Sequence, residues 1–128
     1  KNIALSKDCV DPFNPKVVRA SMGGVFDLSI HTNVELKGFS KNYLIIGASK
    51  NGLNINSFTK PDKFVLIIGS ESHGISEYNL DEINQMITIK RLGKGESLNA
   101  GTAGSIIMYE FSKWMNLFLL IEVRKLQN

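Results

Sequence analysis

The chain has little cysteine and no long apolar run. Cys9 is the single cysteine among 128 residues, so no internal disulfide can form. No basic, apolar and small-residue signal peptide opens the sequence, which makes the reducing cytoplasm the expected compartment. The longest candidate for a membrane span, MNLFLLIEV near the C-terminus, is far too short and carries Glu122. We therefore expect no membrane span.

The signatures of several enzyme classes are also missing. The first apolar run is not followed by GxGxxG, and the chain has no GxxxxGK[ST], CxxC or HExxH motif. The sequence therefore does not indicate dinucleotide binding, phosphoryl transfer or zinc chemistry, and we expect no metal site. Catalysis by Ser, His and Asp lacks a GxSxG turn.

Charge and composition describe an ordinary domain. The formal net charge is +3 and 43% of the residues are hydrophobic, which fits one soluble domain with a full core. No linker, repeat or low-complexity tract divides residues 1–128, so we treat them as one domain. A pI near 9.0 is compatible with a polyanionic partner but also with many unrelated enzymes.

Four short segments are apolar at consecutive positions, which is typical of strands buried on both faces of a mainly parallel sheet. They are residues 2–6, 42–48, 64–69 and 85–89. Helical segments are expected between them. Asn14 and Pro15 open a helix over 15–26, a longer helix should run from about Asn99 to about Leu119, and short helices are expected at 34–39 and at 76–83, the latter capped by Ser76. This alternation predicts an α/β fold with a parallel sheet flanked by helices.

Three exits from the predicted strands carry glycine and small polar residues: 45–52, 67–74 and 89–104. In parallel sheets, ligands bind beyond the carboxyl ends of the strands, so these exits could line one cleft. Other interpretations stay open. Glu71 could simply cap a helix in solvent, and His73 fits an exposed turn better than a catalyst. The small residues at 100–104 could serve tight packing, and Lys90, Arg91 and Lys94 could be solvated or could meet phosphate.

Three stretches resemble the SPOUT superfamily of RNA methyltransferases, in its SpoU/TrmH-like branch. DCVDPFNPKVVRASMGGVFDLSI (8–30) resembles the segment after the family's first motif. FVLIIGSESHGIS (64–76) resembles the second motif, and MITIKRLGKGESLNAGTAGSIIMYE (86–110) resembles the third. Their order and spacing cover most of the chain and make the resemblance specific.

The resemblance implies a trefoil-knotted α/β fold that holds S-adenosylmethionine in the three exit loops. The matching cofactor-binding positions are Ala48, Ser49, Gly69, Ile89, Ser97 and Leu98. Glu71 and Asn99 match positions that shape the catalytic site. The implied reaction is attack of a ribose 2'-hydroxyl of rRNA or tRNA on the sulfonium methyl group, with Gly69 making room for the cofactor.

Family members work as homodimers, and the predicted C-terminal helix carries candidate interface residues. These are Tyr109, Phe111, Trp114, Leu117 and Phe118, for which burial in the monomer core is an equal alternative.

The family's first motif, Asn-x-Gly-x-x-x-Arg, would precede the strand at 2–6, and the chain begins at Lys1. Arg19 lies in the following helix and is not that arginine. The resemblance therefore implies a catalytic domain that lacks its N-terminal motif. One alternative is a non-catalytic RNA-binding or dimerisation module with the same fold. A generic nucleotide-binding domain, which would prefer ATP or NAD, is a third reading.

Overall fold

The computed structural model describes residues 2–59, 61–90, 93, 98–112 and 117–121. Strands and helices alternate along the chain, as the apolar runs predict. In chain order they are β1 (Asn2–Leu5), α1 (Pro15–Ala20), η1 (Gly24–Asp27), β2 (Ser29–His31), η2 (Leu36–Gly38), β3 (Leu44–Asn54), η3 (Ile55–Ser57), β4 (Phe64–Ile68), α2 (Glu77–Leu80), β5 (Gln85–Thr88), α3 (Ala100–Phe111) and β6 (Leu117–Ile121). The η elements are single turns of 3-10 helix.

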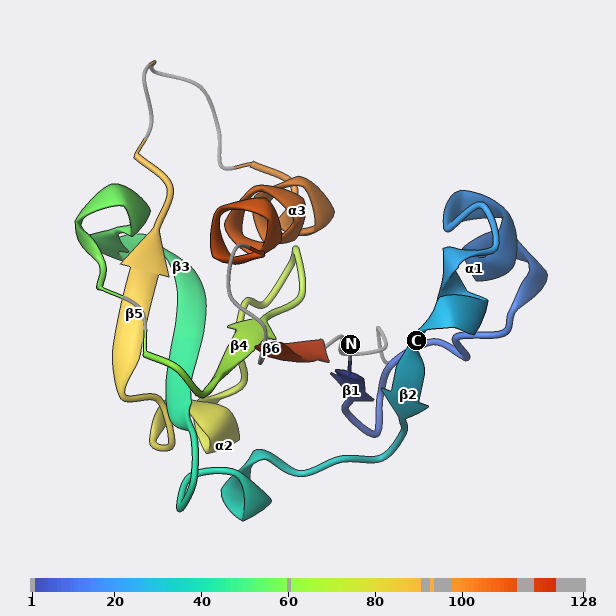
Figure 1. Ribbon diagram of the computed structural model, residues 1–128, viewed down its shortest axis with the longest axis horizontal. Coiled ribbons are helices and arrows are strands. Elements are labelled where there is room, and N and C mark those ends of the chain that lie inside the picture. The colour runs from blue at the N-terminus through green and yellow to red at the C-terminus, as the bar shows by residue number, and fades with distance from the viewer. Residues whose placement is uncertain (1, 60, 91–92, 94–97, 113–116, 122–128) are drawn as a thin grey trace.

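The six strands form one sheet in the order β2-β1-β6-β4-β3-β5 (Figure 1). Every strand pairing in it is parallel, which confirms the predicted parallel sheet. All carboxyl ends therefore lie at the same edge of the sheet. β6 lies between β1 and β4, so the C-terminal strand joins the N-terminal pair to the rest of the sheet.

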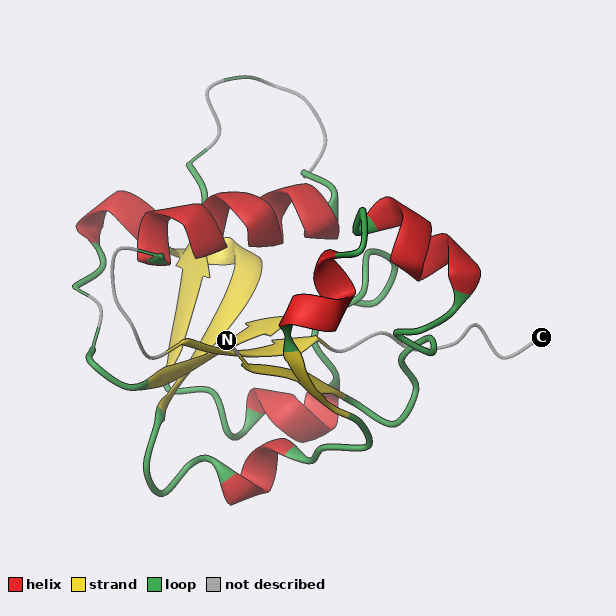
Figure 2. Ribbon diagram, turned by 45° about the vertical axis from the view of Figure 1, so that its right-hand side comes forward, coloured by secondary structure: helices red, strands yellow, loops and turns green. Residues whose placement is uncertain are grey.

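Helices cover both faces of the sheet, with α1, η1 and α3 on one face and η2 and α2 on the other (Figure 2). The side chains of β4 alternate between two core clusters. Leu66 and Ile68 pack in the cluster that contains Ile107 and Phe111 of α3, whereas Val65 and Ile67 pack with Leu36 of η2. Both faces are buried, and this explains why the strand is apolar at every position.

The predicted helix over 99–119 is wrong at its C-terminal end. α3 ends at Phe111, where Ser112 closes the last turn by donating its backbone N–H to the Tyr109 carbonyl oxygen (3.1 Å). Leu117 and Phe118 belong to β6, and Trp114 lies outside the described residues. The run LFLLI has the same continuous apolar pattern as β4, and such a short run fits a buried strand or a buried helix equally well.

The predicted helix over 15–26 is interrupted. Asn14 caps α1 as expected, accepting a hydrogen bond from the Lys16 N–H at its side-chain oxygen (2.9 Å). Met22 and Gly23 then adopt left-handed conformations, with φ of 50° and 81°, which a continuous helix does not contain. The chain resumes as the 3-10 turn η1. The short helix predicted over 34–39 is likewise the 3-10 turn η2. α2 follows its N-cap residue Ser76 as expected, but it ends at Leu80, before the predicted end at 83.

Candidate active site

The three predicted exits line one cleft of about 730 Å³ at the carboxyl edge of the sheet. β3 contributes Ala48 and Ser49, the loop after β4 contributes Gly69 and Glu71, and Ile89, Leu98 and Asn99 form the third wall. Seven of the eight predicted site residues line this cleft: Ala48, Ser49, Gly69, Glu71, Ile89, Leu98 and Asn99. The eighth, Ser97, lies outside the described residues. Their proximity is observed, and their roles stay a prediction.

The first wall is a loop within β3. Ala48 and Leu53 both pair with Ile87 of β5, so the four residues between them do not continue the strand pairing with β5. They bulge out of the sheet at the cleft. Thr88 holds this loop by donating its hydroxyl hydrogen bond to the Lys50 carbonyl oxygen (3.2 Å). At Gly52, a Cβ would lie 2.7 Å from the Met86 carbonyl carbon, so a glycine is needed where the loop returns to the sheet.

The second wall is the loop Gly69–Gly74, which closes on itself. The Ser70 N–H donates to the Gly74 carbonyl oxygen (2.9 Å), and the Gly74 N–H donates back to the Ser70 oxygen (2.8 Å). A Cβ at Gly69 would lie 2.2 Å from the Gly74 carbonyl carbon. The loop's own backbone therefore requires a glycine at position 69. This requirement explains Gly69 without the cofactor, whereas the resemblance implies that Gly69 makes room for the cofactor.

Asn99 and Glu71 meet across the cleft. The Asn99 side-chain oxygen caps α3 by accepting hydrogen bonds from the N–H groups of Gly101 (2.9 Å) and Thr102 (3.2 Å). Its amide nitrogen donates a hydrogen bond to Oε1 of Glu71. The two residues matched to the catalytic site thus contact each other, and the exposed Glu71 carboxylate is anchored to the start of a helix.

The cleft also contains polar residues outside the predicted set: Lys50, Asn51, Ser70, Ser72, His73 and Thr88. Sequence reasoning gave His73 little weight because a lone histidine in a turn is usually solvated. Its position in a loop between two glycines, four residues before the start of α2, gave no signal of its contact with Ser72. The floor of the cleft is apolar and includes Ile68, Ile87 and Ile107.

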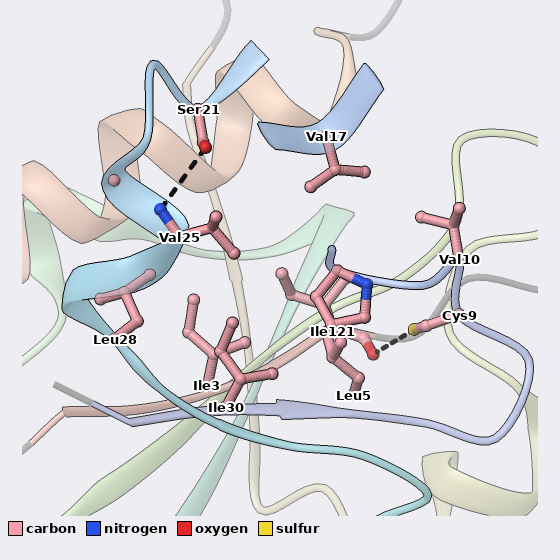
Figure 3. Close-up of a pocket in the computed structure, with 12 residues that line it drawn as sticks. Ile3, Leu5, Cys9, Val10, Val17, Ser21, Val25, Leu28, Ile30 and Ile121 are labelled. Atoms are coloured by element: carbon pink, nitrogen blue, oxygen red, sulfur yellow. Dashed lines mark hydrogen bonds between the residues drawn. The ribbon is translucent and has the colours of Figure 1, made fainter. Parts of the chain in front are cut away.

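A second cavity of about 410 Å³ lies between α1, η1 and the strands β1, β2 and β6. Its walls are mainly aliphatic, and the side chains in Figure 3, including Val17, Val25 and Ile30, surround the space. The polar groups drawn there already bond within the chain: Cys9 donates its thiol to the Ile121 carbonyl oxygen (3.0 Å), and Ser21 accepts from the Val25 N–H (3.4 Å). This cavity offers none of the polar groups of the cleft.

None of the described helices has the length and apolar character needed to cross a membrane. Within the same part of the chain, no group of three or more His, Cys, Asp or Glu side chains is placed to hold a metal ion.

The chain is similar to known RNA methyltransferases. The model of the SpoU rRNA Methylase family matches residues 1–109. The 23S rRNA (guanosine(2553)-2'-O)-methyltransferase RlmP of Bacillus subtilis is 27% identical over 114 residues, covering 84% of this chain and 45% of that protein. A ribosomal RNA small subunit methyltransferase G 2 of Syntrophobacter fumaroxidans is 30% identical over 111 residues, covering 87% of this chain and 22% of that protein. The chain thus spans less than half the length of either relative.

Solved structures share the fold at lower identity. The SpoU methyltransferase AviRb of Streptomyces viridochromogenes, solved with AdoMet, superposes with a TM-score of 0.75 at 24% identity, covering 88% of this chain and 49% of that chain. An AdoMet-bound rRNA methyltransferase of Sinorhizobium meliloti gives 0.74 at 21% identity, covering 88% and 55%. These neighbours support the predicted α/β class. The trefoil knot stays a prediction, because parts of the segments that would form it lie outside the described residues.

Proposed function

Since this chain belongs to the SpoU rRNA methylase family, as the match over residues 1–109 shows, we propose that its cleft binds S-adenosylmethionine and that the protein methylates a ribose 2'-hydroxyl of rRNA or tRNA. The single observation that carries the proposal is the convergence of the three strand exits. Segments about 20 residues or more apart in sequence form one cleft, and each contributes residues that match the family's cofactor loops.

The residues of the cleft fit such a cofactor. Its volume of about 730 Å³ falls within the range of roughly 300–1,000 Å³ typical of small-molecule sites. The apolar floor formed by Ile68, Ile87 and Ile107 suits a flat base, and the polar strand ends suit a ribose and an amino acid group. Ala48, Ser49, Gly69, Ile89 and Leu98 would hold the cofactor, and Ser97 would join them.

The chemistry asks little of the protein beyond placement. When bound, the cofactor would supply a methyl group on a sulfonium sulfur, which is already a good leaving group. The chain's part is to align the hydroxyl with that methyl group and to exclude water, and such alignment accounts for much of the rate in two-substrate reactions. Glu71, anchored by Asn99, is positioned to orient the ribose.

The choice of ribose over base follows the resemblance to the ribose-methylating branch. The name of the Bacillus relative, a 2'-O-methyltransferase acting on 23S rRNA, also supports it. We further propose a cytoplasmic homodimer. α3 leaves Ile106 and Tyr109 exposed and available for an interface, whereas Phe111 is 3% exposed and belongs to the core. For Phe111, burial in the monomer core is therefore favoured over a place in the interface.

A calorimetric titration of S-adenosylhomocysteine into the chain, with ATP as the control ligand, tests the proposed cofactor site. We expect selective binding with a dissociation constant on the order of micromolar, about −8 kcal/mol. Equal affinity for ATP, or no binding by a folded sample, would contradict the proposal. Transfer of a radiolabelled methyl group to unmodified transcripts of rRNA and tRNA, followed by alkaline hydrolysis, then separates ribose from base methylation, because a 2'-O-methyl group blocks cleavage at that nucleotide.

A further inference from the structure

We infer that Phe13 and Phe26 form a platform on which unpaired bases of the RNA substrate stack, beside the cleft and separate from it. The inference rests on the proposed function, because that function supplies the RNA. The two phenyl rings stack on each other, with centroids 6.1 Å apart and planes inclined by 25°. Neither residue lines the cleft. We call this ring pair the aromatic platform.

Both rings of the aromatic platform are open to solvent. Phe13 is 56% exposed and Phe26 is 66% exposed. Phenylalanine is usually buried, so two stacked rings with more than half of their surface in water indicate a surface that a partner covers. Val10 and Met22, in the same segment of the chain, are also exposed.

The backbone that carries the two rings is held in place. The Phe13 N–H donates to Oδ1 of Asp11 (2.9 Å). The Phe26 N–H donates to the Gly23 carbonyl oxygen (3.0 Å), and the neighbouring Val25 is buried in the core. Since the rings are already placed before any partner arrives, little conformational entropy is lost when a base stacks on them.

Two cations follow Phe13 closely in sequence. Lys16 and Arg19 are exposed and lie three residues apart in α1, so they lie on the same side of the helix. Neither forms an ion pair with another described residue. Nε of Arg19 donates to the Pro15 carbonyl oxygen (3.3 Å), which keeps the guanidinium close to the first turn of α1. Aromatic rings that stack bases, combined with cations that meet the backbone phosphates, are typical of surfaces that bind single-stranded nucleic acid.

Stacking should supply most of the affinity of this surface. Residues 7–27 contain three basic and three acidic side chains, so the segment has no net charge. Electrostatic attraction of RNA is therefore modest, whereas stacking of a base on an aromatic ring does not depend on net charge.

The segment that carries the aromatic platform begins at the same edge of the sheet as the cleft. It leaves β1 after Leu5, at the carboxyl end of that strand. The Cys9 thiol donates to the Ile121 carbonyl oxygen (3.0 Å), and Ile121 pairs with Ile68, which lines the cleft. Two strand spacings, about 10 Å in all, therefore separate the start of the segment from the wall of the cleft. An RNA strand that places one ribose in the cleft has its neighbouring bases within reach of this surface.

A second copy of the chain is the other partner that such a surface could bind. An apolar contact between two protein chains requires apolar area, whereas base stacking requires flat aromatic faces. The near-parallel rings, the two unpaired cations and the position beside the cleft all favour RNA. Substitutions that keep the apolar area and remove the flat ring separate the two partners.

Fluorescence anisotropy tests the platform, with a fluorescein-labelled single-stranded RNA of about 12 nucleotides and mixed sequence as the probe. We expect Phe13→Leu and Phe26→Leu each to lower the affinity of the chain for this RNA by about 5- to 150-fold, the range that stacking of one base supplies. Phe13→Trp keeps a flat ring and should bind at least as tightly as the wild type. The same sequence as a duplex should bind more weakly, because its bases already stack inside the duplex.

Tyr78→Leu is the matched control for the ring substitutions. Tyr78 is an aromatic residue that is 64% exposed, but it belongs to α2 on the other face of the sheet (Figure 2). This variant should bind the RNA as the wild type does. Thermal melts and titrations of S-adenosylhomocysteine should be unchanged in all these variants, because the substituted side chains are largely exposed and lie outside the cleft.

The dependence of binding on salt tests the two cations. Lys16→Gln and Arg19→Gln should each reduce the slope of the logarithm of the RNA association constant against the logarithm of salt concentration by about 0.7, as expected for one lost phosphate contact. Lys37→Gln is the control, because Lys37 is exposed in η2 on the other face of the sheet. It should leave the slope unchanged.

Two results would overturn the inference. One is a wild-type chain that does not bind the single-stranded RNA, and the other is an unchanged RNA affinity in both Phe13→Leu and Phe26→Leu. Sedimentation velocity of the double variant Phe13→Ser/Phe26→Ser tests the second partner. Loss of a wild-type dimer, together with unchanged RNA affinity, would assign the surface to a second copy of the chain and not to RNA.

Failure of this inference can be told apart from failure of the proposed function. A wild-type chain that does not bind S-adenosylhomocysteine selectively contradicts the proposed function. Intact binding of S-adenosylhomocysteine and intact methyl transfer, with unchanged RNA affinity in both leucine variants, contradict only the role of the aromatic platform.

Discussion

Asn99 connects the start of α3 to the loop after β4, since its amide nitrogen donates to Glu71 while its side-chain oxygen caps the helix at Gly101 and Thr102. One side chain therefore has a stabilising role and a role in the cleft. Substitutions can separate these two roles, because a helix cap needs only an acceptor oxygen, whereas the contact with Glu71 needs a donor that reaches across the cleft.

The variants Asn99→Ala and Asn99→Ser should differ in stability and agree in activity. Alanine removes the cap and should lower the free energy of unfolding by about 1 kcal/mol, whereas serine retains a capping oxygen and most of the stability. Both lose the long donor to Glu71, so both should lower methyl transfer far more than affinity for S-adenosylhomocysteine. Urea unfolding and single-turnover assays measure the two effects. Unchanged turnover in both variants would remove Asn99 from the catalytic site.

Leu98→Asp should abolish cofactor binding without unfolding the domain. Leu98 lines the cleft but is 48% exposed, so a carboxylate there costs little in packing and would place a charge on the wall that we propose holds the cofactor. Leu53→Asp is the matched control, since Leu53 is 42% exposed and does not line the cleft. Calorimetry with S-adenosylhomocysteine and a thermal melt check both variants. Equal affinity in Leu98→Asp and wild type would exclude Leu98 from the site.

Gly69→Ala should disturb the loop that carries Glu71 and His73. The new Cβ would lie 2.2 Å from the Gly74 carbonyl carbon and 2.4 Å from the Ile75 nitrogen. Both are backbone atoms, so the loop must move. We expect a loss of roughly 1–3 kcal/mol in the free energy of unfolding, together with weaker cofactor binding. Gly38→Ala, where a Cβ meets nothing within 4 Å, should change neither quantity. A fully stable Gly69→Ala would show that the loop can open at little cost.

Val17→Phe should stabilise the protein by filling the apolar cavity beneath α1. Val17 projects into that cavity (Figure 3), and filling substitutions commonly add about 0.5–2 kcal/mol. Val18→Phe is the matched control, because Val18 lies next to it on the same helix and does not line the cavity. Urea unfolding compares them. If Val17→Phe lowered the free energy of unfolding as much as Val18→Phe does, the walls of the cavity could not accommodate the phenyl ring.

The parts of the fold that sequence predicts well are those with one dominant local signal. β4 is apolar at every position because both faces of the sheet are covered, and Asn14 followed by Pro15 is a direct helix-start signal. The convergence of the exits then follows from parallel pairing alone. The contact between Asn99 and Glu71 was not predictable, because it joins residues 28 positions apart through the register of a sheet.

The helix ends were harder to predict. α1 ends where Met22 and Gly23 adopt left-handed backbone; methionine rarely takes this conformation, whereas Gly23 is a helix-end signal that the prediction of a helix over 15–26 did not use. At the C-terminus, LFLLI could continue α3 or form a strand. The sheet decides between these, since β1 and β4 offer two facing rows of backbone donors and acceptors that only an extended segment can satisfy.

Because this segment forms the strand β6, the attachment of β1 and β2 to the rest of the sheet depends on it. Leu119 pairs with Ile3 of β1 on one side and with Leu66 of β4 on the other. Leu119→Pro removes one backbone N–H from this central strand, and proline is confined to edges and bulges in natural sheets. We expect the variant to lose cooperative unfolding and to lose amide protection in β1 and β2 before β3 and β4, as measured by hydrogen exchange and a thermal melt. Leu119→Val keeps the N–H and should unfold as a single unit. If Leu119→Pro melted like wild type, β1 and β2 would have to be held by the contacts of α1 and η1 rather than by the C-terminal strand.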